Sequence, residues 1–438
     1  MTPNDGDEIR RRDAALAQRV SVARGLTLIA ACVLAIACDD GGADATTDGE
    51  APVADGSTGA GGAPGSGGLP GEVGPDAEAP PPLTLSAVSG DLTYAELKPD
   101  GHVYSVQADG ALRMRVTSEP GYWSHHAVGP NPRYLVGVRA IDQDGDGRSD
   151  PGAPGEVWII DVRERLEYPI SPEGCDAGIG GVGWQTELAV LFAMDCGDGP
   201  PAAYLAQRDD RSRDRDRLLK VSNHDAPVRD VFPAVGTSIY AYVVDVEACA
   251  GNRCVVKPQI WVGDVETDLA CQVTDGDLQF TDLTTITGGG RRLGDHTPSF
   301  TGDLTALLFS RNVGGKPPGP EGHHDAFRVG FQARALFAGA NTCAVADSLT
   351  DLSGAAIDES YETVAGETVV GDERFPQGAA GRAAQGALLY TGQTHVGVGT
   401  SVVWLVDRLG TRRALTPERG QAGFARWIVA DYMLGGDR

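Results

Sequence analysis

The sequence lacks any concentration of positive charge. Over its 438 residues the formal net charge is -25, and in the densest basic run, residues 208–217, arginine alternates with aspartate. Nucleic-acid affinity depends on accumulated positive charge, so we expect no nucleic-acid partner. We interpret the arginine-rich run as a solvated loop, because its opposite charges cancel over a short distance.

The short motifs of common hydrolases and nucleotide-binding enzymes are also absent. The sequence has no G-x-S-x-G, no H-E-x-x-H and no phosphate-cradling glycine loop. One group of candidate site residues remains in the segment "GHHDAF". It consists of His323, His324 and Asp325, which lie in a glycine- and proline-rich insertion. These groups suit a transition metal or acid–base chemistry, but adjacent histidines on a strand cannot both point into one site. We therefore interpret them as exposed loop residues, with a metal or catalytic site as the alternative.

No apolar run is long enough to span a bilayer comfortably. The strongest candidate, residues 25–37, follows five arginines and ends in small residues before Cys38. A charged start, a short apolar run and a small-residue end are typical of a secretory signal. We expect residues 1–37 to be the signal peptide of an exported protein.

The residues before Cys38, "LAIAC", resemble the lipobox of bacterial lipoproteins. The position three before the cysteine is Ala35, where the family most often has leucine, and Leu34 lies one position earlier. The resemblance implies that Cys38 is acylated and anchors the protein to the inner or outer membrane, with the folded domain in the periplasm or at the cell surface. An ordinary signal peptide cut near the same place is the alternative.

The segment after the anchor, residues 38–82, contains no aromatic residue and consists almost entirely of Gly, Ala, Pro, Asp, Glu, Ser and Thr. It cannot bury enough apolar surface to offset its ordering entropy. We interpret it as a flexible tether that holds a folded domain, residues 83–438, clear of a membrane surface.

Residues 83–438 contain a repeated hairpin. Each copy has an apolar strand with an early aromatic residue, a polar turn, and a second strand that ends near Ser or Thr. The copies begin at Gly101, Gly155, Ala203, Pro258, Arg334 and Ser401. A second hairpin unit falls between them and is clearest in "HTPSFTGDLTALLFSR", residues 296–311. Two hairpins make a four-stranded sheet, and insertions explain a mean repeat of about 60 residues, longer than compact propeller blades.

Two segments, "PSFTGDLTALLFS" and "VVWLVDRLGTRRALT", resemble blades of the TolB-like, WD40-like propellers. The resemblance implies an all-β fold of four-stranded blades. The first clear hairpin has no strong partner unit upstream, and the last unit, residues 423–433, has no hairpin after it. We therefore predict a six-bladed β-propeller whose ring is closed by N- and C-terminal strands. Two or three β-sandwich modules in a row are the alternative.

The stretch "DQDGDGRSD", residues 142–150, has the spacing of a calcium-binding loop. The predicted ligands are Asp142, Asp144, Asp146, the carbonyl of Arg148, and Asp150. Position twelve is Ala153, so the usual bidentate glutamate is missing there. Hard oxygen ligands favour Ca²⁺ over zinc or copper. We predict a structural Ca²⁺ site, with a merely polar glycine turn as the alternative.

Six cysteines remain when the two in the signal and anchor are set aside, an even number that suits an oxidising compartment. Spacing favours Cys175 with Cys196 and Cys249 with Cys254, leaving Cys271 with Cys343. Six cysteines allow fifteen connectivities, so the last pair stays open.

The resemblance to TolB-like propellers implies a non-enzymatic binding or scaffold module. Such a module would present its loops and central channel to another envelope protein. We expect a monomeric propeller that meets the membrane only through its lipid anchor. The alternative is an exported propeller enzyme, such as a lyase or glycan hydrolase, with its site at the channel mouth.

Overall fold

The structure is a computed structural model in which the chain divides into two units, Met1–Ala77 and Glu78–Arg438. The described residues are 87–250, 253–276, 294–301, 304–312, 324–332, 334–345, 350–351, 363–364, 367–368, 373–378, 388–393, 401–406, 412–416 and 421–428. The predicted signal peptide, Cys38 and the tether lie outside them. Within these ranges, no helix has the length and apolar character needed to cross a membrane.

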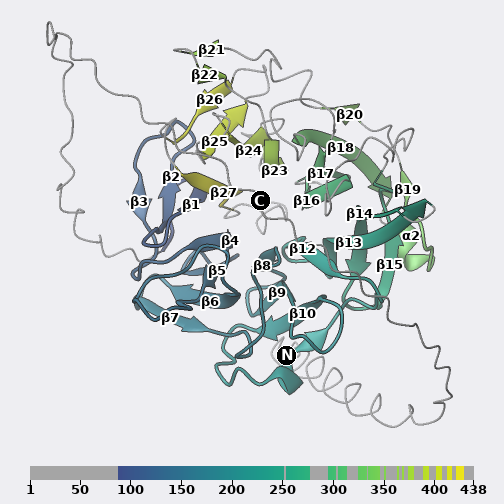
Figure 1. Ribbon diagram of the computed structural model, residues 1–438, viewed down its shortest axis with the longest axis horizontal. Coiled ribbons are helices and arrows are strands. Elements are labelled where there is room, and N and C mark those ends of the chain that lie inside the picture. Colours follow the sequence, from purple (N-terminus) through teal and green to yellow (C-terminus); the bar gives the residue numbers. More distant parts are fainter. Residues whose placement is uncertain are drawn as a thin grey trace, which may run out of the picture. The chain divides into compact units, whose positions relative to one another are not determined.

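Antiparallel sheets make up the second unit (Figure 1). The first sheet has β27 (Ala422–Trp427), β1 (Leu92–Glu96), β2 (Val103–Val106) and β3 (Met114–Arg115). The second has β4 (Trp123–Val128), β5 (Tyr134–Ala140), β6 (Gly155–Asp161) and β7 (Leu166–Pro169). The third has β8 (Val182–Trp184), β9 (Ala189–Met194), β10 (Ala202–Gln207) and β11 (Leu219–Lys220), with the 3-10 helix η2 (Arg215–Arg217) before β11.

Three more sheets follow along the chain. The fourth has β12 (Val228–Pro233), β13 (Ile239–Ala250), β14 (Arg253–Asp264) and β15 (Leu269–Gln272). The fifth has β16 (Gly294–Phe300), β17 (Ala306–Asn312), β18 (His324–Gln332), β19 (Ala344–Val345) and β20 (Thr350–Asp351), with helix α2 (Arg334–Phe337) after β18. The sixth has β23 (Glu373–Gly378), β24 (Leu388–Gln393), β25 (Ser401–Val406) and β26 (Arg412–Ala414); β21 (Thr363–Val364) and β22 (Glu367–Thr368) form a separate two-stranded sheet.

The first strand of each sheet contacts the first strand of the next. The contacts run from β27 to β4, β8, β12, β16 and β23, and β23 also contacts β27. We call these six the inner strands. Stacked antiparallel sheets with such a set of inner strands are the architecture of an all-β propeller with four-stranded blades.

The hydrophobic core lies between neighbouring sheets. Strand β9, "AVLFAM", is buried along its whole length because it lies between two other sheets. Val190 and Phe192 pack in a cluster shared with the second sheet, whereas Leu191 and Ala193 pack in one shared with the fourth. Alternate residues of a strand point to opposite faces, so a strand between two sheets must be apolar on both. Full burial of one large apolar side chain contributes about 1.5 to 3 kcal/mol.

The blade count differs from the prediction. The sequence predicts six four-stranded blades, but the structure has five four-stranded sheets. The remaining large sheet, which contains β16 to β20, has five strands. In that sheet the place of a fourth strand is divided between two short strands, because β19 pairs with the end of β18 and β20 pairs with its middle.

The hairpin predicted to begin at Arg334 is also wrong. The third strand of the fifth sheet is β18, which lies upstream, and "RALF" forms helix α2. Alanine, leucine and arginine favour a helix, whereas the alternating apolar residues of "AFRVGF" suit a strand. By contrast, β27 pairs with β1, as the predicted joining of N- and C-terminal strands requires. Closure of the whole ring stays a prediction.

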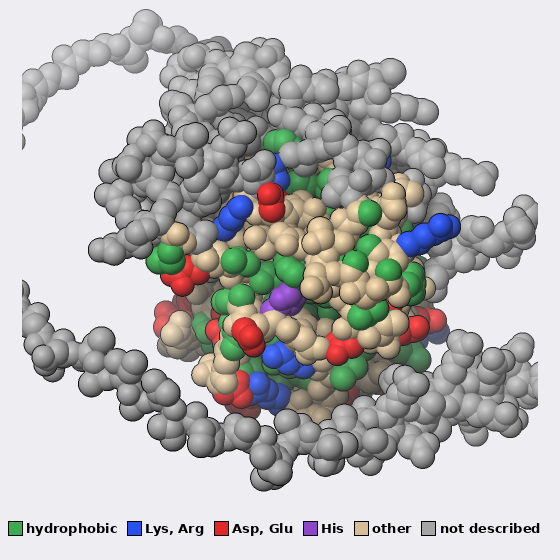
Figure 2. All heavy atoms as spheres, turned by 90° about the vertical axis from the view of Figure 1, so that its right-hand side faces the viewer, with side chains coloured by type: hydrophobic (Ala, Val, Ile, Leu, Met, Phe, Trp, Pro, Cys, Tyr) green, Lys and Arg blue, Asp and Glu red, His purple; other side chains and the backbone are tan. Residues whose placement is uncertain are grey.

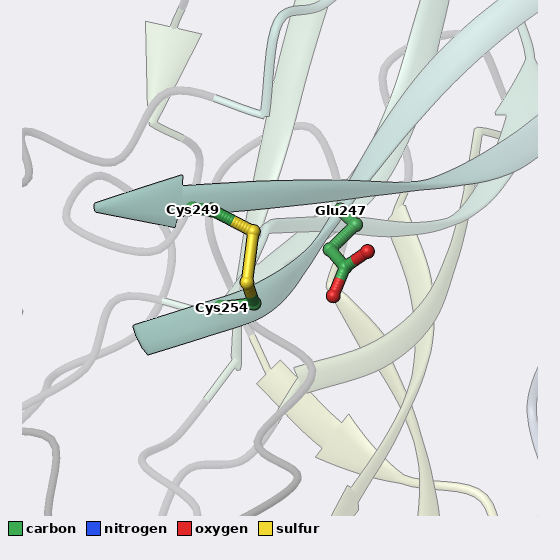
Figure 3. Close-up of side chains that lie close together, drawn as sticks. All are labelled: Glu247, Cys249 and Cys254. Atoms are coloured by element: carbon green, nitrogen blue, oxygen red, sulfur yellow. A yellow bond between two sulfur atoms is a disulfide. The ribbon is translucent and has the colours of Figure 1, made fainter. Parts of the chain in front are cut away.

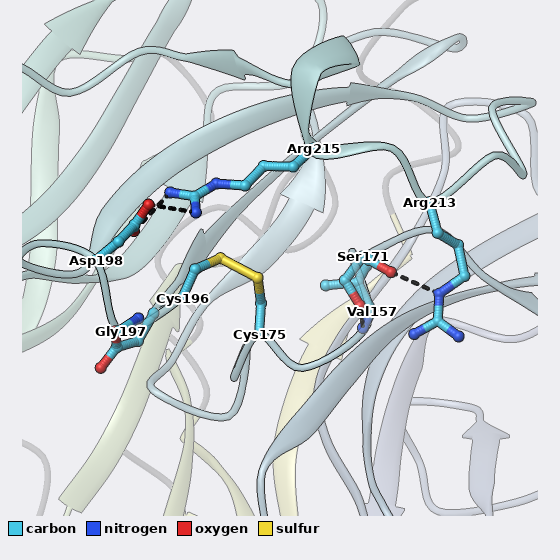
Figure 4. The surroundings of a disulfide bond; sticks show 9 residues. Val157, Ser171, Cys175, Cys196, Gly197, Asp198, Arg213 and Arg215 are labelled. Carbon is cyan, nitrogen blue, oxygen red and sulfur yellow. Dashed lines mark hydrogen bonds and ion pairs between the residues drawn. A yellow bond between two sulfur atoms is a disulfide. The ribbon is translucent and has the colours of Figure 1, made fainter.

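Two disulfides join the pairs that spacing favours, Cys175–Cys196 and Cys249–Cys254, and a third joins the remaining pair, Cys271–Cys343. Near the first of them, arginines of the 208–217 run form hydrogen bonds and ion pairs (Figure 4). Arg215 binds both oxygens of Asp198 at 2.6 and 2.8 Å, and the Nε of Arg213 donates to the carbonyl of Ser171 at 2.8 Å. The run is therefore a loop held by paired charges rather than a freely solvated one.

Candidate functional site

The predicted calcium loop connects β5 to β6 and is exposed. Carboxylate oxygens of Asp142, Asp144 and Asp146 lie within 4.8 Å of one another. Asp142 also organises the turn, because its oxygens accept from the backbone N–H groups of Gly145 at 2.7 Å and Gly147 at 2.8 Å. This arrangement gathers three hard oxygen ligands at one point, which suits a cation such as Ca²⁺.

The other two predicted ligands, Asp150 and the carbonyl of Arg148, are not part of this group of carboxylates. Asp150 accepts from the backbone N–H of Gln143 at 2.7 Å and so closes the base of the loop. Arg148 donates its backbone N–H to the carboxylate of Asp146 at 2.8 Å. The structure therefore groups three of the five predicted ligands, and the Ca²⁺ site itself stays a prediction.

The expectation that His323, His324 and Asp325 are exposed loop residues is wrong for two of the three. His324 and Asp325 belong to strand β18, and His324 is half-buried. The ring of His324 lies 5.4 Å from the ring of His296 on β16, with the two planes near perpendicular. His323 lies outside the described residues.

A second cluster, which the sequence analysis did not find, arises from distortions of the inner strands. In β4, β12, β16 and β27 the pairing register shifts, which marks a β-bulge. At each shift stands a non-glycine residue with positive φ: His125 at 40°, Asp230 at 50°, Thr297 at 50° and Phe424 at 51°. Bulges re-aim side chains, and positive φ outside glycine carries strain that is common at functional sites.

These distorted strands line a small pocket. Its lining residues are His125, Gly181, Asp230, Val231, Thr297, Pro298 and Arg426. They come from four inner strands and from the segment that precedes β8. We call this cavity the central pocket.

A network of buried charges lies against the central pocket. The guanidinium of Arg229 donates to Asp245 at 2.9 and 3.0 Å and to Asp230 at 2.6 Å, and its other nitrogen lies 2.9 Å from Nδ1 of His296. Beside this network, Arg311 binds both oxygens of Asp295 at 2.6 and 2.9 Å. Buried charges that are paired and hydrogen-bonded in this way hold their side chains in fixed positions.

Arg426 differs from these arginines. It is 8% exposed, and its Nε has no hydrogen-bond partner among the residues that the structure describes. Its guanidinium carbon lies 4.7 Å from the centre of the Phe232 ring. Burial lowers the pKa of Arg426 to about 10, so the group remains cationic at neutral pH. Burial, together with the charge of Arg426, lowers the pKa of His125 to about 3, so this imidazole is neutral.

Sequence reasoning missed the central pocket because its residues are far apart in the chain. A local signal did exist: polar residues interrupt otherwise apolar strands in "WSHHAV", "VRDVFP" and "GDHTPSF". A buried strand contains charged residues only where they find partners or serve a ligand. The repetition of this interruption in equivalent units could have indicated a shared polar centre.

On the face drawn in Figure 2, charged side chains are not gathered into one cluster. There, acidic and basic side chains are scattered among hydrophobic and other side chains. The described side chains on this face form no basic patch.

No protein-family model and no curated protein matches the sequence. Among solved structures, the fold is similar to TolB from Acinetobacter baumannii, with 14% identity, a TM-score of 0.47, and coverage of 77% of this chain and 66% of that one. It is also similar to a putative TolB from Agrobacterium tumefaciens, with 11% identity, a TM-score of 0.43, and coverage of 78% and 99%. Hydrazine synthase from Kuenenia stuttgartiensis gives 9% identity, a TM-score of 0.47, and coverage of 78% and 47%. Similarity at this level concerns the fold alone and carries no information about function.

Proposed function

We propose that this chain is an exported, lipid-tethered propeller that works by binding a protein of the cell envelope rather than by catalysis. The observation that carries the proposal is a projecting ribbon formed by β13 and β14. These strands pair over 12 residues each, but β12 accompanies β13 only as far as Val244, and β15 meets β14 only from Trp261. Beyond those points the two strands continue as a ribbon.

Near its end this ribbon is exposed and is crosslinked by a disulfide. The Cys249–Cys254 disulfide joins directly opposed residues of the two strands, and Glu247 lies beside it (Figure 3). Glu247, Cys249 and Cys254 are all exposed. A short hairpin normally pays an entropic cost when it is ordered on binding, and a cross-strand disulfide removes part of that cost beforehand. Rigidly presented connections on a stable scaffold are where recognition usually occurs.

The central charges also favour a scaffold. Asp230 and Asp245 are both held by Arg229, and Asp295 is held by Arg311. A general acid or base must be able to exchange a proton with a substrate, whereas these carboxylates are engaged by arginines. We further propose that the sheets of the propeller form a closed ring, which the contacts among inner strands and the pairing of β27 with β1 support.

Site-specific crosslinking tests the binding proposal. A photo-crosslinking amino acid at position 247, on the ribbon, is compared in intact envelopes with the same residue at position 112. Leu112 is 65% exposed and lies on the turn between β2 and β3, so it controls for chance encounters. We expect a discrete crosslinked envelope protein from position 247 and none from position 112.

The same experiment distinguishes the binding proposal from the exported-enzyme alternative. Equal labelling from both positions would contradict a recognition role for the ribbon. If no partner is captured and the purified protein turns over a glycan or peptide, the exported-enzyme alternative is correct.

A further inference from the structure

The unusual group in the central pocket is Arg426. Leaving a buried guanidinium nitrogen without an acceptor is costly, and such groups are rare in folded proteins. The neighbouring Arg229 and Arg311 each bind a carboxylate through more than one hydrogen bond. The charge of Asp230 interacts with that of Arg426, but Oδ2 of Asp230 already accepts from Arg229 and from the backbone N–H of Thr297 at 3.3 Å.

The pocket around Arg426 is accessible and narrow. Arg426, His125 and Asp230 line it, and each of these residues is 8% exposed. They are presented by three different inner strands, two of which are bent by bulges that place His125 and Asp230 at positive φ. A strained backbone that directs polar side chains into one small cavity indicates a ligand site rather than a packing defect.

We propose that Arg426 binds the carboxylate of a small organic acid or of a peptide C-terminus in the central pocket. This site is separate from the ribbon, so it goes beyond the proposed function. A planar guanidinium matches a carboxylate in geometry and charge. Asp230 lies on the same pocket and repels a second negative charge. The site therefore favours a single carboxylate over a dicarboxylate or a phosphate dianion.

Calorimetric titration of the full-length protein tests the site directly. The probes are acetate, an N-acetylated tripeptide of alanine with a free carboxylate, the same tripeptide as its C-terminal amide, and inorganic phosphate. We expect the tripeptide acid to bind at least tenfold more tightly than its amide. Acetate that binds as well as the tripeptide acid would identify a small organic acid as the ligand, and a clear preference for the tripeptide would identify a peptide C-terminus.

Variants separate binding from structure. Arg426→Gln should weaken binding of the carboxylate probe at least tenfold, whereas Arg413→Gln, at an exposed arginine that donates to the carbonyl of Ala108, should leave it unchanged. Because Arg426 lacks a full set of partners, Arg426→Gln should keep or raise the midpoint of thermal unfolding of the empty protein. An arginine with a purely structural role would lower that midpoint.

Three results would overturn the proposal. They are equal binding of the acid and amide tripeptides, unchanged binding by Arg426→Gln, and phosphate binding as tight as that of acetate. The acid–amide comparison uses the unaltered protein, so it decides the matter even if a variant does not fold.

Discussion

Two adjacent histidines on β4 give the protein a dependence on pH that belongs to single residues. His125 and His126 are buried, and Nε2 of His126 lies 3.0 Å from Oγ1 of Thr93. Burial is the main cause that lowers the pKa of each to about 3, and the charge of Arg426 adds to it. An unfolded histidine titrates near 6.5. Between these values the unfolded chain binds more protons than the folded one, so stability falls as pH falls.

The predicted size follows from this difference in bound protons. Each histidine contributes up to about 1.4 kcal/mol per pH unit to the loss of unfolding free energy between about pH 6.5 and 3. His126→Gln keeps a group that can bond to Thr93 but removes one titrating group. The slope of the unfolding free energy against pH should therefore decrease by up to about 1.4 kcal/mol per pH unit, the contribution of one bound proton. Urea unfolding at several pH values from 7 to 4 measures it. An unchanged slope in the variant would show that His126 does not titrate in this range.

The acidic loop allows a second test at the residue scale. Asp144→Ala combined with Asp146→Ala should remove one Ca²⁺ per chain, because two of the three grouped carboxylates are lost. Without a cation the remaining acids repel, so residues 141–156 of the original protein should become more protease-sensitive when calcium is chelated. Affinity should be weak, about 10⁻⁴ to 10⁻³ M. Elemental analysis checks this, with Asp109→Ala in another exposed turn as the control; equal calcium in all proteins would exclude the site.

Residue-scale predictions from the sequence depended on signals that lie within one short segment. The acidic loop could be located because ligand spacing within residues 142–150 is a property of one short segment. Arg426 could not be found in this way, because its pocket partners His125 and Asp230 lie in other sheets. Only the arrangement of the inner strands brings these three side chains together.

Among the elements, β27 is the one whose removal should matter most. It pairs with β1, and its Ala422 and Ala425 are buried in the cluster that includes Leu92. Deleting residues 421–438 would expose that cluster and the unpaired edge of β1. A loss of several kcal/mol, at about 2 to 4 °C per kcal/mol, should lower the thermal midpoint by about 10 °C or abolish the cooperative transition.

The control for this deletion removes only residues 39–82. That tether has almost no apolar content, so its removal should leave the thermal midpoint nearly unchanged. Calorimetry of both shortened proteins provides the comparison. A normal cooperative melt without residues 421–438 would contradict a structural role for β27.

Strand elements were predictable where period-two alternation was clear, as in "GEVWIID", which became β6 with its alternating burial. The fifth sheet was misread because an aromatic residue in "RALF" matched the hairpin pattern. Its local preference is helical, and in the structure Phe337 is 67% exposed rather than packed in a sheet. A pattern of residue types does not report which of two neighbouring segments has a strand to pair with.

For the whole molecule, the main prediction concerns the anchor. Cys38→Ser should move the protein from the membrane fraction to the soluble fraction, because a single thiol would carry the acyl chains. Their burial contributes about 0.8 kcal/mol per methylene. Fractionation of cells that produce each form measures the effect. If the serine form stays with the membranes, the lipobox resemblance is misleading.

The pairing of β27 with β1 also sets the order in which the chain can mature. Strand β1 cannot pair with β27 until residues 422–427 have been synthesised, so this edge of β1 stays unpaired while the strands between them are made. A chain that stops before β27 cannot complete the first sheet and leaves this edge open to proteases. The pairing thereby makes the completion of one sheet depend on two segments that are more than 300 residues apart.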